Sequence, residues 1–182
     1  MDPGRTLSRL HLPAFGVYAD LATPAHAAWL IKSFVEYIKN SGPDVYRNYV
    51  DAEAIVELLN DTCYPFRDTP CNEGSGLMMF TFETENSQLT GGCLLSVETP
   101  WYAKPGTLVS LSEVATFAVP GHAGVTRFTI ALMEELSKQF ASDCPVVLCA
   151  GASVPKSAPL VTNSYRKMGF QSHSVFYKLL NK

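Results

Sequence analysis

The 182-residue chain contains no run of lysines or arginines, and its formal net charge at pH 7 is only −3. A charge this small provides no electrostatic surface for nucleic acid or for an anionic membrane. No apolar stretch approaches the roughly 20 residues of a membrane-spanning helix, and residues 1–15 lack the apolar centre of a signal peptide. We therefore expect a soluble cytoplasmic protein that binds neither nucleic acid nor a membrane.

The chain is also poor in patterns that bind metals or form disulfides. Its five cysteines include no Cys-x-x-Cys pair and its four histidines show no ligand spacing, so no metal site is predicted. Cys93 and Cys149 lie within apolar strand patterns and are interpreted as reduced core residues. Cys63 and Cys71 flank a proline-containing loop and could form a bridge, although we expect a cytosolic protein to keep them reduced.

The hydrophobic fraction of 47% and the charged fraction of 17% indicate a folded protein, and the length fits one domain. Thr23-Pro24 is a typical helix start, and apolar residues then recur with a helical period up to Ile38. A second, shorter helix is predicted to begin at Asp51. Before these helices we expect a loose lead-in over residues 1–11 and a first strand over residues 14–19.

The second half of the chain alternates strand and helix patterns. Residues 77–84 and 89–98 predict a β-hairpin, and a long strand follows over residues 107–119. A helix with an apolar stripe then begins at Val125. The remaining order is strand (145–151), helix, and a last strand within residues 171–180. This order predicts an α+β, or mixed α/β, sheet with helices on both faces.

The segment from Gly106 to Phe170 resembles the acyl-CoA-binding half of the GNAT superfamily of N-acetyltransferases, and the resemblance extends over roughly residues 76–180. The resemblance depends on Gly91-Gly92, Val119-Pro120, Gly124 and the helix end Tyr165-Arg-Lys-Met-Gly-Phe170, which occur in the family's order. It implies a single domain over residues 1–182, with an N-terminal helical part (1–75) and an acyl-CoA-binding core (76–182). It also implies a mostly antiparallel central sheet with one splayed pair of parallel strands.

In this family, a loop before a helix binds the pyrophosphate of acetyl-CoA through its N–H groups. The loop of this chain departs from the family pattern, because Ala123 stands where Arg or Gln is usual. Thr126 and Phe128 also replace small residues, and Arg127 could supply the missing charge. An N–H near Phe117 or Val119 is expected to stabilise the developing oxyanion. The predicted acetyl-CoA-binding residues are Phe117, Ala118, Val119, His122, Ala123, Gly124, Val125, Thr126 and Arg127.

The resemblance also points to the catalytic groups. Glu113 lies in an apolar strand where related enzymes commonly carry a glutamate, so it is our first candidate for the base that deprotonates an amine. The alternative is a glutamate that faces solvent. Tyr165 occupies the position of the tyrosine that protonates the departing CoA thiolate, and the alternative is a tyrosine that only packs on the sheet. Glu98 is a second candidate base, and with Trp101 and Tyr102 it belongs to the predicted acceptor-binding loop.

Two functions follow from these residues. The first is an N-acetyltransferase that transfers an acetyl group from acetyl-CoA to a primary amine, on a small molecule or a peptide, by direct attack in a ternary complex. The second is a GNAT-fold binding or structural protein that has lost acyl-CoA, as the departures in the loop suggest. The aromatic pair and the degenerate loop resemble divergent members of the family in bacteriophage genomes. Only one strand is expected after Phe170, so an open sheet edge could support a homodimer.

Overall fold

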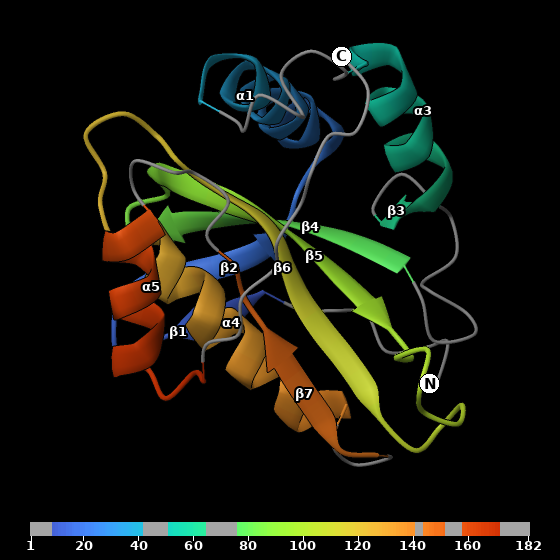
Figure 1. Cartoon of the computed structure of the whole chain (residues 1–182). Coiled ribbons are helices and arrows are strands. Elements are labelled where there is room, and N and C mark those ends of the chain that lie inside the picture. Colours follow the sequence, from blue (N-terminus) through green and yellow to red (C-terminus); the bar gives the residue numbers. More distant parts are fainter. Residues whose placement is uncertain (1–8, 42–50, 65–75, 141–143, 152–157, 172–182) are drawn as a thin grey trace.

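The computed structural model describes residues 9–41, 51–64, 76–140, 144–151 and 158–171 of the chain. In these residues, seven strands form one mixed sheet in the order β1-β2-β4-β5-β6-β7, with β3 pairing beside β4 (Figure 1). The strands are β1 (Leu10–Leu12), β2 (Val17–Leu21), β3 (Cys63–Tyr64), β4 (Gly76–Thr84), β5 (Leu89–Glu98), β6 (Val109–Ala118) and β7 (Val146–Cys149). The helices are α1 (Pro24–Ser41), α3 (Ala52–Thr62), α4 (Val125–Phe140) and α5 (Ala158–Lys167).

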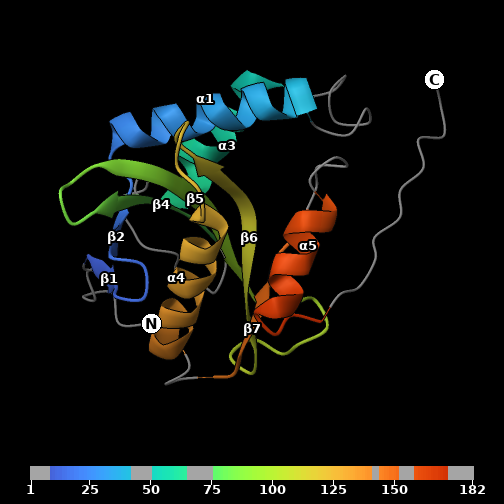
Figure 2. The same cartoon turned by 90° about the vertical axis from the view of Figure 1, so that its left-hand side faces the viewer.

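The helices form two layers around the sheet. Helices α1 and α3 lie on one face, and α4 lies on the other with α5 beside it (Figure 2). Each layer has its own buried apolar cluster. The cluster under α4 includes Leu132 and Leu136, and the cluster under α1 and α3 includes Leu30 and Leu59. This arrangement confirms the predicted α+β sheet with helices on both faces.

Two consecutive glycines in β5 bring both helix layers close to the sheet. A Cβ atom on Gly91 would lie 2.3 Å from the Phe117 carbonyl oxygen and 2.9 Å from the Val125 side chain, at the start of α4. A Cβ atom on Gly92 would lie 2.8 Å from the Leu30 side chain of α1. A larger residue at either position would push the backbone or a helix away from the sheet. Gly91 therefore allows α4 to begin close to the sheet, and Gly92 allows α1 to pack closely on the other face.

The parallel strands β6 and β7 separate partway along their length. Their pairing runs from Val109↔Val146 to Ser112↔Cys149, whereas β6 continues to Ala118. On the β7 side, the edge of β6 over residues 113–118 therefore has no strand partner among the described residues. This is the splayed parallel pair that the sequence analysis predicted.

A bulge in β6 lies at the same point. Residues Leu94 and Leu95 of β5 pair with Ala115 and Glu113, so Val114 is an extra residue in β6. The bulge reverses the alternation of side chains after Glu113.

The local sequence signals were mostly confirmed. The Thr23 hydroxyl accepts a hydrogen bond from His26 N at 3.3 Å, and the Asp51 carboxylate accepts from the N–H groups of the first turn of α3. The hairpin β4–β5 also forms as predicted. The Tyr165 helix ends as expected, with Gly169 at a φ of 88°.

Other expectations were wrong or fall elsewhere. The predicted lead-in contains β1, and the first long strand begins at Val17, because residues 13–16 form a tight turn that ends at Gly16 with a φ of 61°. Cys149 is exposed rather than buried, since it lies at the end of β7. Cys71 and the expected last strand within residues 171–180, on which the homodimer depended, lie outside the described residues apart from residue 171.

Candidate active site at the splayed strands

A partly buried carboxylate and a buried tyrosine meet where β6 leaves β7. The Tyr165 hydroxyl of α5 donates a hydrogen bond to Oε2 of Glu113 in β6, and it also lies 3.3 Å from the carbonyl oxygen of Gly151. Thr116 Oγ1 donates to the other oxygen, Oε1 of Glu113, at 2.6 Å. The structure thus joins the predicted base and the predicted acid, which are 52 residues apart in sequence.

Burial sets the protonation of this pair. It raises the pKa of Glu113 above its ordinary value, and the hydrogen bonds from Thr116, Tyr165 and the Gly151 backbone lower that pKa in part. Burial also raises the pKa of Tyr165, and the Glu113 charge beside it raises this pKa further. The tyrosine therefore keeps its proton, while the carboxyl group is poised to take one up more readily than an exposed glutamate.

The loop between β6 and α4 presents backbone N–H groups. Gly121 and Gly124 have φ angles of 89° and 90°, which favour glycine. The loop is closed by a hydrogen bond from His122 N to the Val119 carbonyl at 3.0 Å. Among the hydrogen bonds of the described residues, none uses the N–H groups of residues 123–126 as a donor. Four consecutive free donors at a helix N-terminus form a suitable binding site for an anion.

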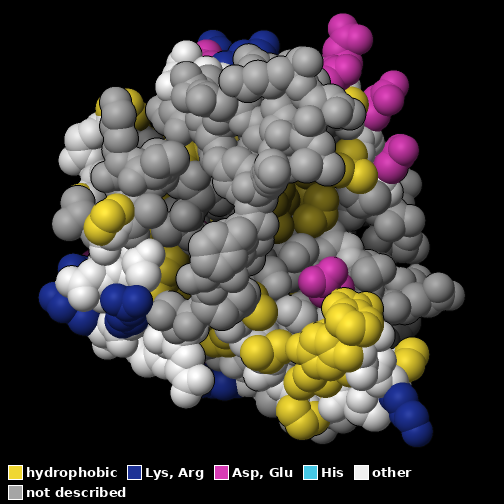
Figure 3. Space-filling view, viewed as in Figure 1, with side chains coloured by type: hydrophobic (Ala, Val, Ile, Leu, Met, Phe, Trp, Pro, Cys, Tyr) yellow, Lys and Arg dark blue, Asp and Glu magenta, His cyan; other side chains and the backbone are white. Residues whose placement is uncertain are grey.

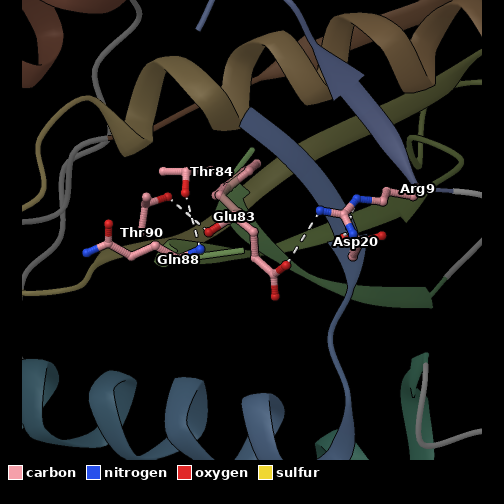
Figure 4. Close-up of polar contacts among 7 residues, drawn as sticks. Arg9, Asp20, Glu83, Thr84, Gln88 and Thr90 are labelled. Atoms are coloured by element: carbon pink, nitrogen blue, oxygen red, sulfur yellow. Dashed lines mark hydrogen bonds and ion pairs between the residues drawn. The ribbon is translucent and has the colours of Figure 1, made fainter. Parts of the chain in front are cut away.

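Polar contacts connect this loop with the turn between β4 and β5. The Gln88 backbone N–H donates to Thr84 Oγ1 at 3.2 Å, and the Thr90 hydroxyl donates to the Phe82 carbonyl at 3.0 Å (Figure 4). The Gln88 side-chain amide lies 3.3 Å from Nε2 of His122. His122, predicted to bind the ligand, is therefore oriented by the hairpin turn.

The same view shows a separate cluster of charges. Arg9 lies 3.4 Å from Asp20 and 3.6 Å from Glu83 (Figure 4). Its guanidinium group also stacks on the Tyr18 ring. Burial raises the pKa of Asp20, Arg9 lowers it and Glu83 raises it. These contacts connect Arg9, just before β1, with Asp20 in β2 and Glu83 in β4. They lie apart from the Glu113–Tyr165 pair, which joins β6 and α5.

One expectation about the loop needs correction. Phe128, which replaces a small residue of the family, packs with its ring centroid 5.2 Å from that of Phe15 and 5.8 Å from that of Phe82, and a Cβ atom on Gly124 of the loop would lie 3.6 Å from its ring. The N–H of Val119 donates to the Thr90 carbonyl at 2.9 Å, so it is not available to an oxyanion. Because N–H groups alternate in direction along a strand, the N–H of Phe117 also points to β5 and that of Ala118 points to the open edge.

The remaining predicted residues are spread along the molecule. Ala123 and Gly124 are exposed in the loop, Val125 is buried beneath it, and Thr126 and Arg127 begin α4, with Arg127 exposed. The Phe117 ring lies on the opposite face, 6.1 Å from the ring centroid of Phe34 in α1. Only the backbone of Phe117 therefore remains close to the predicted cofactor path.

The predicted acceptor loop precedes β6, so it lies at the end of this strand opposite the anion-binding loop. Trp101 is 95% exposed and Tyr102 is 67% exposed, and their rings contact each other edge-on. Figure 3 shows a group of hydrophobic side chains at its lower right, over this connection between β5 and β6. Glu98 is exposed and pairs with Ser110 at the start of β6, whereas the anion-binding loop follows the end of that strand.

Sequence reasoning missed Thr116, Thr129 and Gly151. Thr116 shares a face with Glu113 only because of the bulge at Val114, and no residue type in the strand marks that bulge. Thr129 lies one turn into α4 and is fully buried. Its position between the apolar residues Val125 and Leu132 could have identified it as a polar group that needs a partner.

Comparisons with known proteins support the fold. No protein-family model matches the chain, and the search of curated proteins found no match. A solved structure of a possible acetyltransferase from Clostridium difficile 630 matches with a TM-score of 0.58 at 8% identity, covering 91% of this chain and 99% of that chain. An aminoglycoside antibiotic 6′-N-acetyltransferase from Acinetobacter baumannii matches with a TM-score of 0.51 at 14% identity, covering 92% and 99%.

A third structure extends this likeness. The spermidine/spermine N-acetyltransferase of Vibrio cholerae matches with a TM-score of 0.50 at 15% identity, covering 88% of this chain and 81% of that chain. Identities this low establish a shared fold and no more. The protein has the fold of the GNAT acetyltransferases.

Proposed function

We propose that this protein is an N-acetyltransferase that transfers an acetyl group from acetyl-CoA to a primary amine by direct attack in a ternary complex. The observation that supports this most is the hydrogen-bonded pair of Glu113 and Tyr165 at the point where β6 and β7 separate. A base and an acid at one opening of the sheet are what amine acetylation requires.

The backbone around this opening fits an acyl-CoA molecule. The open edge of β6 offers the N–H of Ala118 to the amide groups of an extended ligand, as a neighbouring strand would. The free N–H groups of residues 123–126, at the start of α4, would hold the pyrophosphate. When bound, acetyl-CoA supplies the acetyl group as an activated thioester. The loop lacks the usual Arg or Gln, so backbone groups would carry most of the binding to phosphate.

Glu113 and Tyr165 then divide the proton transfers. Glu113 takes a proton from the attacking amine, and Tyr165 donates its hydroxyl proton to the leaving sulfur. Because Tyr165 already donates to Glu113, the proton on Glu113 can pass back to the phenolate oxygen and restore both groups. No net proton has to leave the pair during the transfer. The amine loses one proton and the thiol gains one.

The first experiment is titration calorimetry with acetyl-CoA and with CoA. We expect wild type to bind both ligands with micromolar affinity, and Tyr165→Phe and Glu113→Gln to keep this binding because the loop holds the phosphates. Asn163→Ala, an exposed change on the same helix as Tyr165, is the matched control. Release of CoA thiol in a screen of primary amines then measures turnover, which both site variants should lose.

The second candidate function is a GNAT-fold binding protein without acyl transfer. The absence of Arg or Gln at Ala123 and the exposed position of Arg127 favour it. This alternative predicts no heat of binding even at millimolar acetyl-CoA. That result would refute the enzyme, whereas binding without turnover of any amine would retain the cofactor site and refute only the transfer reaction.

A further inference from the structure

A row of hydroxyl groups links Glu113 to the helix that follows the anion-binding loop. Thr116 Oγ1 donates to Glu113 Oε1 at 2.6 Å and lies 3.1 Å from Thr129 Oγ1. The Thr129 hydroxyl in turn donates to the Val125 carbonyl at 3.1 Å, in the first turn of α4. The row crosses from the sheet to α4 and ends one residue after the loop.

Counting hydrogens shows that this row has two complete states. Each threonine hydroxyl has one hydrogen to donate and can accept at its oxygen. When Glu113 is a carboxylate, Thr116 donates to it, and Thr129 donates to Thr116 or to Val125. When Glu113 is protonated, Glu113 can donate to Thr116, Thr116 to Thr129, and Thr129 to the Val125 carbonyl. Glu113 therefore retains Thr116 as a partner before and after it takes up a proton.

We propose that Thr116, supported by Thr129, is a positioning residue that holds the Glu113 carboxyl group at the open edge of β6 in both of its protonation states. The importance of this role for turnover rests on the proposed function, because it assumes that Glu113 is the base. The positioning itself depends only on the contacts of the folded protein. A carboxyl group held in one place on both sides of a proton transfer needs no reorganisation during the step.

The groups around Glu113 decide the sign of the effect. Among the described residues, the titratable groups that face it are Tyr165 from α5 and Cys93 from β5. The Thr116 donor favours the charged carboxylate, so its removal should raise the pKa of Glu113 further. Cys93 is fully buried, and burial raises the pKa of its thiol, although a hydrogen bond with the Thr129 side chain lowers that pKa in part. The thiol therefore stays neutral and adds no charge beside Glu113.

The test is an NMR titration of the Glu113 side-chain carbonyl in protein labelled with ¹³C-glutamate. The Glu113 signal is the one that disappears in Glu113→Gln. Thr116→Val removes the hydroxyl at nearly constant shape. We expect its midpoint to rise by about 0.5–1 pH unit, because the hydrogen bond lost from the charged carboxylate is stronger than the one lost from the neutral acid. Thr116→Ser should restore the wild-type midpoint, and Thr129→Val should produce a smaller rise.

Thr81→Val is the matched control. Thr81 is also a buried strand threonine, but its hydroxyl has no hydrogen-bond partner among the described residues. Its replacement should leave the Glu113 midpoint unchanged. An unchanged midpoint in Thr116→Val, or a serine variant displaced as far as the valine variant, would overturn the proposal.

This readout is independent of the enzyme activity. If the protein binds no acetyl-CoA, the proposed function fails, yet the titration still reports whether Thr116 holds Glu113. If acetylation is found, the acidic limb of kcat/KM should move upward in Thr116→Val by the same amount as the NMR midpoint. The KM for acetyl-CoA should stay constant, because Thr116 touches no predicted phosphate donor. Movement of KM alone would contradict a role in positioning the base.

Discussion

The partly buried Glu113 should make the stability of the protein decrease as the pH rises, and Glu113→Gln should remove this decrease. Burial raises the pKa of Glu113 above the ordinary value of 4.5, so the folded state holds its proton longer than the unfolded state. Between the two pKa values the folded protein therefore binds more protons. The free energy of unfolding then decreases with pH, starting near pH 4.5 and ending above the folded pKa.

The contribution of Glu113 to the pH dependence of the free energy of unfolding is set by the one proton that it binds. A single group that is protonated in the folded state and ionised in the unfolded state changes the stability by about 1.4 kcal/mol per pH unit. The slope of wild type should thus be more negative than that of Glu113→Gln by up to this amount. Burial raises the pKa of Asp20 in both proteins, so its contribution cancels in the difference.

The assay is urea unfolding followed by tryptophan fluorescence at a series of pH values between about 4 and 8. Glu134→Gln, an exposed change on α4, is the control and should run parallel to wild type. Parallel curves for wild type and Glu113→Gln would refute the reasoning, because they would show that the carboxyl group titrates alike in the folded and unfolded protein. A difference in absolute stability alone would not decide the matter, since glutamine also changes the hydrogen bonds to Thr116 and Tyr165.

Two further changes test the framework of the site. Gly91→Ala should destabilise the protein by about 1–3 kcal/mol in urea unfolding, because the new methyl group meets the Phe117 carbonyl and Val125. It should also weaken acetyl-CoA binding through displacement of α4. Asp51→Ala should reduce stability by about 1 kcal/mol, since the carboxylate accepts from Glu53 N and Ala54 N, and it should leave acetyl-CoA affinity unchanged.

Elements with local signals could be predicted from the sequence. Thr23 and Asp51 mark helix starts because their side-chain oxygens accept hydrogen bonds from N–H groups of the first turn. Pro24 suits the first helical position because it has no N–H group there to leave without a partner. The hairpin β4–β5 follows from two apolar runs joined by a polar turn. The pairing of Glu113 with Tyr165 was expected only as two separate roles inferred from a family resemblance.

Features that depend on contacts across the fold could not be predicted. The bulge at Val114 forms because β5 and β6 pair with different spacing, and it alone places Thr116 beside Glu113. The sequence gives the position of Phe128 along the helix but not the Phe15 and Phe82 rings that it packs against. Trp101 and Tyr102 stay a predicted acceptor pocket, because a loop sequence does not show what its exposed aromatic side chains face.

The composition of the pair itself argues against a purely structural role. Among the described residues no lysine, arginine or histidine pairs with Glu113, and its charge is compensated only by hydrogen bonds from Thr116, Tyr165 and the Gly151 backbone. Neutral donors offset the cost of desolvating a carboxylate only in part, and burial accordingly raises its pKa. A domain that needed only a stable junction between β6 and α5 would be served better by apolar side chains of similar volume. A proton acceptor at the open edge of β6 accounts for the carboxylate where packing does not.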